Sequence, residues 1–261
     1  MRADQLERAL QLARAVAACP SAQLLAAFRS SALEVTLKAD GSPVTRADRE
    51  AEASMRAMLR ASSEFGNLAV LGEEGGLAGG DTPYRWLLDP IDGTLSFTRG
   101  IPTFGTIVAL EETATGQPLL GVIHVPCFGD TFMAGRGLGS WRNDRRIRVS
   151  EASDLRTALV SAPDAREFRQ AKLRPGYRRV WDACDRLRGY TDCWAHAQVA
   201  SGIIDAVVEP GLRPWDIRAT QVLVEEAGGK QITRPSAYPG TVDSIFGSAL
   251  LVDQLAELMG F

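Results

Sequence analysis

The chain contains 261 residues, of which 45% are hydrophobic and 23% are charged, as in an ordinary soluble globular protein. A chain of this length can bury a substantial core, as one large domain or as two smaller ones. The formal net charge of −3 gives no electrostatic reason to expect binding to nucleic acid or to an anionic membrane.

Cysteines and histidines restrict the chemistry that the chain can perform. The four cysteines show no CxxC spacing and lie in apolar stretches, so we expect reduced thiols, as in a cytoplasmic protein. The two histidines, His124 and His196, support neither a histidine-based zinc site nor a Ser-His-Asp triad. Any catalysis is therefore expected to depend on carboxylates.

The N-terminal segment predicts two helices. Leucines and alanines recur at helical spacing over residues 4–18, and a second helix is expected over residues 22–29, after Pro20. Charged residues such as Asp4 and Arg8 make the first helix amphipathic and argue against a signal peptide, and no apolar stretch is long enough to span a bilayer. We therefore expect a cytoplasmic protein without a membrane segment.

The next segment is expected to form a loop, a helix and a short strand. Residues 38–43 have loop composition, and a helix from Thr45 is expected to end near Arg60. The spacing of Thr45 and Asp48 fits an N-terminal capping arrangement, which is one interpretation of Asp48. A strand over residues 67–71 is then expected to end in a Gly-Glu-Glu-Gly-Gly turn.

The stretch over residues 84–110 contains the most informative motif. An apolar run predicts a buried strand that ends at Asp89 and continues as Pro-Ile-Asp-Gly-Thr. Proline fixes φ and glycine permits a tight turn, so Asp89 and Asp92 can converge. Two close carboxylates repel unless a proton or a cation lies between them, and all-oxygen ligation favours Mg²⁺. Gly93 and Thr94 can open a helix whose free N–H groups face an anion. Ordinary surface-turn chemistry is the alternative, because Asp-Pro and Asp-Gly pairs are common in turns.

Around Ser150 the pattern changes to alternating strands and helices. We therefore expect an N-terminal half, residues 1–150, that carries most candidate metal ligands, and a C-terminal half, residues 151–261, that carries Asp216. In the first half, further strands are expected over residues 103–110, 119–125, 130–134 and 147–149. In the second half, the expected elements are a strand over 158–161, a basic helix and loop over 166–179, a strand over 186–190, a helix over 192–201, a buried strand over 206–209, a helix over 215–227, and a segment over 244–252 before a last helix.

Acidic residues recur at the predicted strand ends and helix starts: Asp48, Glu73 with Glu74, Asp89 with Asp92, and Asp216. Taken singly, each has an ordinary explanation, such as helix-dipole complementation for Asp48 and Asp216 or an exposed loop for Glu73. Taken together, the Gly-Glu-Glu, Asp-Pro-Ile-Asp-Gly-Thr and Trp-Asp motifs, with Glu-Ala-Gly-Gly ending the last helix, closely resemble the inositol monophosphatase family. The resemblance covers nearly the whole chain, in the family's order and spacing.

The resemblance implies a layered α-β-α-β-α fold of the α/β class, a homodimer and a Mg²⁺-dependent phosphatase acting on a small phosphate ester. In that family Glu73, Asp89 and the carbonyl of Ile91 would hold one Mg²⁺. Asp89, Asp92 and Asp216 would hold a second, and a third, weaker ion contacting Glu73 is a further option by similarity. Two such cations roughly 4 Å apart bridge the phosphate, one presenting a water and the other stabilising the leaving alkoxide.

The same resemblance assigns roles to residues around the metal. Thr94, backed by Asp48, would orient and help to deprotonate the attacking water, with Glu73 nearby. The N–H groups of Gly93 and Thr94 would bind phosphate oxygens. Lys38 can approach the site from its loop, but a mobile surface position is the favoured interpretation. A relative that binds metal or phosphate without catalysis is the non-enzymatic alternative, and the intact motif residues speak against it.

The segment Asp192-Cys193-Trp194 is similar to that of the histidinol-phosphate phosphatases of the family. Histidinol phosphate carries an ammonium group and an imidazole, so Asp192 or Glu209 near the pocket would be useful, with Trp194 as a flat apolar wall. The alternatives are that Asp192 caps its helix, that Cys193 and Trp194 are core residues, and that Glu209 binds a sugar hydroxyl as in the inositol phosphatases. Inositol monophosphate is therefore the second candidate substrate. His196 is expected to be a packed histidine.

Two residues depart from the family's pattern. Leu95 stands where relatives often have a polar residue, and Arg218 replaces a small residue. Both are expected near the site, where they would alter its specificity.

Overall fold

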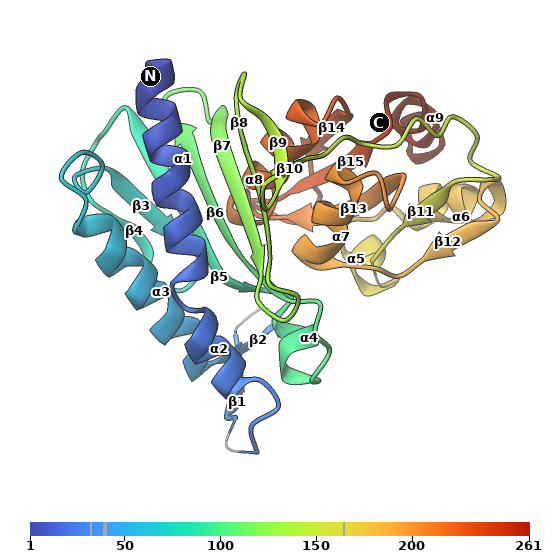
Figure 1. The fold of residues 1–261 in the computed structure, drawn as a ribbon. Coiled ribbons are helices and arrows are strands. Elements are labelled where there is room, and N and C mark those ends of the chain that lie inside the picture. Colours follow the sequence, from blue (N-terminus) through green and yellow to red (C-terminus); the bar gives the residue numbers. More distant parts are fainter. Residues whose placement is uncertain (32, 39–40, 164) are drawn as a thin grey trace.

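The computed structural model describes residues 1–31, 33–38, 41–163 and 165–261. Helices and sheets alternate in layers across the molecule (Figure 1). The helices α1 (Ala3–Ala18) and α3 (Arg46–Arg60) cross one side of the larger sheet, and the C-terminal elements lie on its other side. This arrangement confirms the predicted layered α/β architecture.

The larger sheet contains eight strands within the described residues, in the order β10-β9-β8-β7-β6-β5-β3-β4. Neighbouring strands are antiparallel except for β3 and β5, which are parallel. The bounds are β3 (Ala69–Gly72), β4 (Gly76–Ala78), β5 (Tyr84–Asp92), β6 (Gly105–Glu112), β7 (Pro118–Val125), β8 (Asp130–Gly135), β9 (Gly139–Arg142) and β10 (Arg145–Arg146).

Helices cover both faces of this sheet. On one face, α1 (Ala3–Ala18) and α3 (Arg46–Arg60) pack against Trp86 and Leu88 of β5. On the other face, α7 (Asp192–Ala200) and α8 (Pro214–Glu226) pack against Leu87. Because both faces of β5 are buried, its residues form a continuous apolar run and do not alternate with polar ones.

The smaller sheet contains five strands in the described part of the chain, in the order β12-β11-β13-β15-β14. Its bounds are β11 (Leu159–Ser161), β12 (Arg186–Arg188), β13 (Ala206–Leu212), β14 (Lys230–Pro235) and β15 (Val242–Gly247). Val207 and Phe246 pack towards α7 and α8, whereas Val208 and Ile245 pack towards α5 (Ala165–Gln170), α6 (Arg174–Ala183) and α9 (Ala249–Met259). The two middle helices are therefore shared between the sheets.

Short elements complete the fold beyond the end of β5: α2 (Ser21–Ala27), the hairpin of β1 (Val35–Leu37) and β2 (Pro43–Thr45), and α4 (Thr94–Thr98). The predicted boundary near Ser150 falls between β10 and β11, in the connection between the sheets. Helix α8 contacts both sheets, so the halves share part of their core, and the division into two halves stays a prediction. None of the helices in the described ranges combines the length and apolarity needed to cross a membrane.

The predicted strand over residues 147–149 is wrong. Ile147 donates its N–H to the carbonyl of Ser140 and Val149 donates to the carbonyl of Ala227, outside any ladder. The sheet is extended instead by β9 and β10, which form a hairpin before this segment is reached.

Candidate active site

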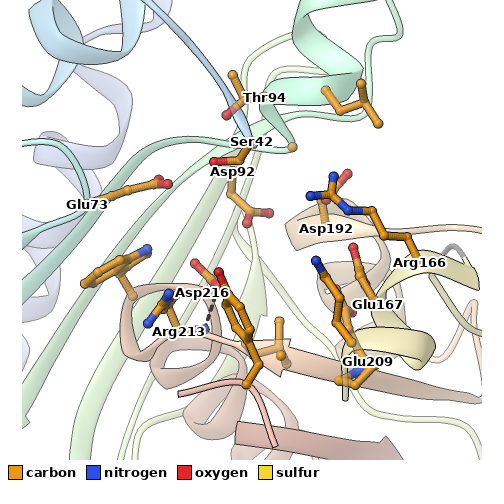
Figure 2. A pocket seen from close by; sticks show the side chains of 18 of the residues that line it. Ser42, Glu73, Asp92, Thr94, Arg166, Glu167, Asp192, Glu209, Arg213 and Asp216 are labelled. Atoms are coloured by element: carbon orange, nitrogen blue, oxygen red, sulfur yellow. Dashed lines mark hydrogen bonds between the residues drawn. The ribbon is translucent and has the colours of Figure 1, made fainter. Parts of the chain in front are cut away.

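A cavity of about 480 Å³ lies where the ends of β5 and β13 meet the start of α8 and α5. Acidic side chains from these elements point into the same space (Figure 2). The cavity is lined by most of the predicted site residues, namely Glu73, Asp92, Gly93, Thr94, Asp192, Glu209 and Asp216.

A β-bulge makes Asp89 and Asp92 converge. Asp89 pairs with Ile107 of β6 and Asp92 pairs with Gly105, so β5 has one more residue than β6 between these pairs. Residues three apart in a regular strand point to opposite faces, and the extra residue returns both carboxylates to one face. Because of this bulge, β5 runs on to Asp92 and does not end at Asp89 as predicted.

Asp216 brings a third carboxylate from the first turn of α8. Its Oδ2 accepts a hydrogen bond from the N–H of Arg213 at 2.7 Å, so Asp216 also caps the helix. One carboxylate oxygen from each of Asp89, Asp92 and Asp216 lies within 4.8 Å of the other two. The capping role and the position in the cluster are therefore compatible.

The electrostatics of this cluster fit a divalent cation. Burial, and then the charges of neighbouring carboxylates, raise the pKa values of Asp89 and Asp216 well above their ordinary range. Burial also raises the pKa of Asp92 to about 6. Oxygen ligands at this spacing suit a hard cation such as Mg²⁺, whose charge would offset their mutual repulsion.

The turn that presents Glu73 is anchored by a buried ion pair on α3. Glu52 accepts hydrogen bonds from the N–H groups of Glu74 at 2.7 Å and Gly75 at 2.9 Å. Arg56 donates to Glu52 at 2.6 Å, one helical turn away. Glu73 and Glu74 are therefore half-buried and held in place, so the interpretation of Glu73 as part of an exposed loop is wrong.

Lys38 reaches into the cavity. Its Nζ lies 2.8 Å from a carboxylate oxygen of Glu73 and 2.5 Å from one of Glu74. The expectation of a mobile surface lysine is therefore wrong. In the sequence, the loop position of Lys38 just before the helix that carries Asp48 indicated that the lysine could approach the site. A loop sequence alone does not reveal which distant carboxylate a lysine pairs with.

Thr94 and Asp48 each form local hydrogen bonds. Thr94 Oγ1 donates to the carbonyl of Ile91 at 3.0 Å. Asp48 is buried and accepts hydrogen bonds from the N–H of Thr45 at 2.8 Å and from its Oγ1 at 2.6 Å, which is the predicted capping arrangement. No hydrogen bond joins Asp48 to Thr94 in the described ranges, so their joint role, like metal binding by the Ile91 carbonyl, stays a prediction.

Asp192 lies on the cavity wall beside the turn that holds Asp92. Thr191 is the N-cap of α7, and Asp192 follows it with a φ of 61°. Its Oδ2 accepts hydrogen bonds from the hydroxyls of Thr191 at 2.8 Å and Ser96 at 3.4 Å. A β-carbon on Gly93 would be 3.0 Å from this oxygen. The interpretation of Asp192 as a helix cap is therefore wrong.

A second β-bulge directs Glu209. Glu209 pairs with Ser244 of β15 and Leu212 pairs with Val242, so β13 again carries one extra residue. Bulges re-aim side chains at sheet edges and near active sites. The Glu209 carboxylate lines the cavity and is hydrogen-bonded to His196 at 2.8 Å.

Trp194 is partly buried and packs against the core, and it does not line the cavity. It packs between the sheets, with its ring centroid 5.5 Å from that of Tyr190, and the aromatic lining of the cavity is provided by Trp215 and Tyr238. Cys193 is also buried in this core. Of the two alternatives for Trp194, the core interpretation is therefore correct.

Leu95 lies at the cavity, where it was expected, and Arg218 does not. Leu95 lines the cavity and is 54% exposed. Arg218 points to the larger sheet instead, where its Nε donates to Glu111 at 3.1 Å. The expectation that Arg218 acts near the site is wrong, because its guanidinium pairs with this buried carboxylate.

Known proteins are similar to this chain in sequence and in fold. The inositol monophosphatase family model matches residues 5–249. The chain is 35% identical over 231 residues to the histidinol-phosphatase of Streptomyces coelicolor, covering 84% of each chain. It is 36% identical over 201 residues to the inositol-1-monophosphatase of Mesorhizobium japonicum, covering 76% of this chain and 74% of that one. The crystal structure of the extragenic suppressor protein suhB from Bartonella henselae matches with a TM-score of 0.86 at 28% identity, over 97% of this chain and 98% of that one. The chain therefore belongs to the inositol monophosphatase family and is a phosphoric monoester hydrolase.

Proposed function

We propose that this enzyme hydrolyses histidinol phosphate to histidinol and inorganic phosphate, with Mg²⁺ as its cofactor. The observation that carries the proposal is a second pair of carboxylates, Asp192 and Glu209, on the cavity wall beside the cation-binding cluster (Figure 2). The ammonium and imidazole groups of histidinol phosphate would find counter-charges there. Inositol phosphate offers only hydroxyl groups in the same place.

The electrostatics of Asp192 support a cationic ligand. Burial, followed by the charges of Asp92 and Glu209, raises the pKa of Asp192 to about 7. A carboxylate that is desolvated and repelled by its neighbours gains more from a cationic ligand than from a neutral one. The relative from Streptomyces coelicolor, which carries the name histidinol-phosphatase, also supports this substrate.

Two Mg²⁺ ions suit the ligands that the cavity offers. Glu73, Asp89 and the carbonyl of Ile91 would hold one, and Asp89, Asp92 and Asp216 would hold the other. One carboxylate oxygen of Glu73 pairs with Lys38, and the other would go to the first ion, so we propose two ions and not a third that also contacts Glu73. When bound, the ions would supply Lewis-acid activation of the attacking water and of the phosphate.

The protein's own groups would orient the reactants. The N–H groups of Gly93 and Thr94 would receive phosphate oxygens. Thr94 would orient the attacking water, with Glu73 nearby and Asp48 behind it once the hydroxyl turns away from Ile91. Water is the nucleophile, so no covalent phosphoenzyme is required.

Inositol-1-phosphate is the second candidate substrate. Glu209 can also accept hydrogen bonds from sugar hydroxyls. The relative from Mesorhizobium japonicum, which has a comparable identity to this chain over a shorter span, is named an inositol-1-monophosphatase.

A direct comparison of the two substrates tests the proposal. Phosphate release from histidinol phosphate and from inositol-1-phosphate is measured with and without Mg²⁺, with Asp92→Asn as the inactive control. We expect the higher kcat/KM with histidinol phosphate, and Asp192→Asn should raise its KM about tenfold, since a charge-assisted contact is lost. Asparagine tolerates the positive φ of this position, so the backbone is retained. A preference for inositol-1-phosphate would refute the substrate assignment.

A further inference from the structure

His196 is hydrogen-bonded through both ring nitrogens inside the protein. It is 1% exposed and lies on α7, one helical turn after Asp192. Its Nε2 is 2.8 Å from Oε2 of Glu209 on β13, and its Nδ1 is 2.8 Å from Oγ1 of Thr220 on α8. The ring of Phe246 packs edge-on against it, with centroids 4.8 Å apart. The imidazole is therefore fixed between three elements.

The contact with His196 restricts how Glu209 can present its charge. Glu209 is 6% exposed and lines the cavity. Its Oε2 is taken by His196, which leaves Oε1 for a ligand in the cavity. A glutamate side chain has several rotatable bonds, and a hydrogen bond to a buried ring selects one of its conformers before a ligand arrives.

The same hydrogen bonds connect Glu209 to the helix that carries Asp216. Thr220 follows Asp216 by four residues on α8, so the two side chains lie on one face of the helix, one turn apart. Thr220 and His196 thus fix the position of Glu209 relative to the cation-binding cluster. A substrate with a phosphate at one end and a positive charge at the other must match the distance between this cluster and Glu209.

We infer that His196 is a positioning residue for substrate preference, which holds Glu209 in the orientation that the non-phosphate end of the substrate meets. The inference rests on the proposed hydrolysis of histidinol phosphate, because it assigns His196 a role in binding that substrate. Both hydrogen bonds of His196 go to Glu209 and Thr220, neither of which is a proposed cation ligand, so His196 acts through Glu209.

The charges around His196 agree with this role. Burial by itself would lower the pKa of His196, but the carboxylates of Glu209, Asp92 and Asp192 outweigh burial and raise it. An imidazole in this environment is a strong hydrogen-bond donor to Glu209. What distinguishes His196 from the other buried histidine, His124, is that its partner Glu209 lines the cavity.

Steady-state kinetics with two substrates tests the inference. Histidinol phosphate has a cationic end, whereas p-nitrophenyl phosphate offers the same phosphate without one. In His196→Phe, which keeps an aromatic ring but loses both hydrogen bonds, we expect KM for histidinol phosphate to rise about tenfold or more. Values of kcat and KM for p-nitrophenyl phosphate should stay within about twofold. His196→Gln should restore much of the affinity, because its amide N–H can replace the Nε2–H donor to Glu209.

His124 provides a matched control. It is also buried, at 8% exposure, and its Nδ1 is 2.8 Å from the hydroxyl of Thr131, but it lies on β7 and does not line the cavity. His124→Phe should leave KM for both substrates unchanged. Thr220→Val serves if His196→Phe does not fold, since it removes the Nδ1 partner and keeps the ring. We expect a smaller rise in KM for histidinol phosphate in Thr220→Val.

The outcomes separate this inference from the proposed function. A folded His196→Phe that keeps the wild-type KM, or that loses activity equally on both substrates, would overturn the positioning role alone. A wild-type enzyme that hydrolyses p-nitrophenyl phosphate but not histidinol phosphate would overturn the proposed function and, with it, this inference. A selective rise in KM that His196→Gln reverses would support both.

Discussion

Gly93 lies between the carboxylate cluster of Asp89, Asp92 and Asp216 and the second pair of carboxylates, Asp192 and Glu209. It follows Asp92 in the chain, and its φ of +83° places a substituted β-carbon 3.0 Å from Oδ2 of Asp192. Gly93→Ala therefore combines a left-handed backbone, which costs about 1–2 kcal/mol for a residue with a β-carbon, with displacement of Asp192. We expect the melting temperature to fall by about 2–8 °C, and kcat/KM for histidinol phosphate to fall by about a hundredfold.

Gly228→Ala is the control for this substitution. Its φ of +86° is nearly the same, but no atom of the described structure lies within 4 Å of its added β-carbon, and it follows the far end of α8. It should lower the melting temperature similarly and leave kcat/KM unchanged. A similar loss of activity in Gly228→Ala would mean that backbone strain, and not the contact with Asp192, explains the effect of Gly93→Ala.

At the scale of elements, α3 determines where the turn with Glu73 lies. Glu52→Gln keeps the shape of the side chain but removes the negative charge that balances Arg56. It also leaves one accepting oxygen where two carboxylate oxygens accept the N–H groups of the turn. Breaking a buried ion pair by neutralising one partner costs about 3–5 kcal/mol. We expect this loss in urea denaturation, and a roughly tenfold rise in the Mg²⁺ concentration for half-maximal activity, because Glu73 is no longer held.

The exposed pair on the same helix provides the comparison for Glu52. Glu50 is 3.3 Å from Arg46, and both side chains are exposed. Surface pairs of this kind contribute about 0–1 kcal/mol, so Glu50→Gln should change neither stability nor the Mg²⁺ requirement measurably. If Glu52→Gln left the Mg²⁺ requirement unchanged while lowering stability, α3 would stabilise the fold without positioning Glu73.

The elements that could be predicted from the sequence are those with a local signal. The apolar run of β5, the Thr45 cap of α3 and the helical spacing of α1 each indicate a structure within one segment. The strands that prediction missed, such as β10 and β14, are short or polar, and β14 lies at a sheet edge, so they lack the apolar alternation that marks a strand. Both bulges escaped prediction too, because a bulge is defined by the register of the partner strand.

At the scale of the whole molecule, long-range pairing separates what could be predicted from what could not. The convergence of Asp89 and Asp92 followed from one hexapeptide, and the position of Asp216 from resemblance to the family. The contacts of Lys38 with Glu73 and of Arg218 with Glu111 join distant segments, and no spacing pattern encodes them. The homodimer and the cytoplasmic location stay predictions, because they concern the surroundings of the chain and not its fold.

The carboxylate cluster of Asp89, Asp92 and Asp216 joins β5 to α8, so the proposed metal binding should stabilise the molecule as a whole. A ligand that binds only the folded state at about 100 times its Kd contributes about 2.7 kcal/mol, or about 5–10 °C in a chain of this size. We expect scanning calorimetry to show this rise on replacing EDTA with Mg²⁺. In Asp216→Asn the metal-free protein should melt at or above the wild-type temperature, because one repelling charge is gone while the side-chain oxygen can still accept from Arg213. The Mg²⁺ increment should disappear in that variant, yet persist in Asp130→Asn, which breaks an ion pair with Arg142 outside the cavity. An equal Mg²⁺ increment in Asp216→Asn would show that the cation binds elsewhere.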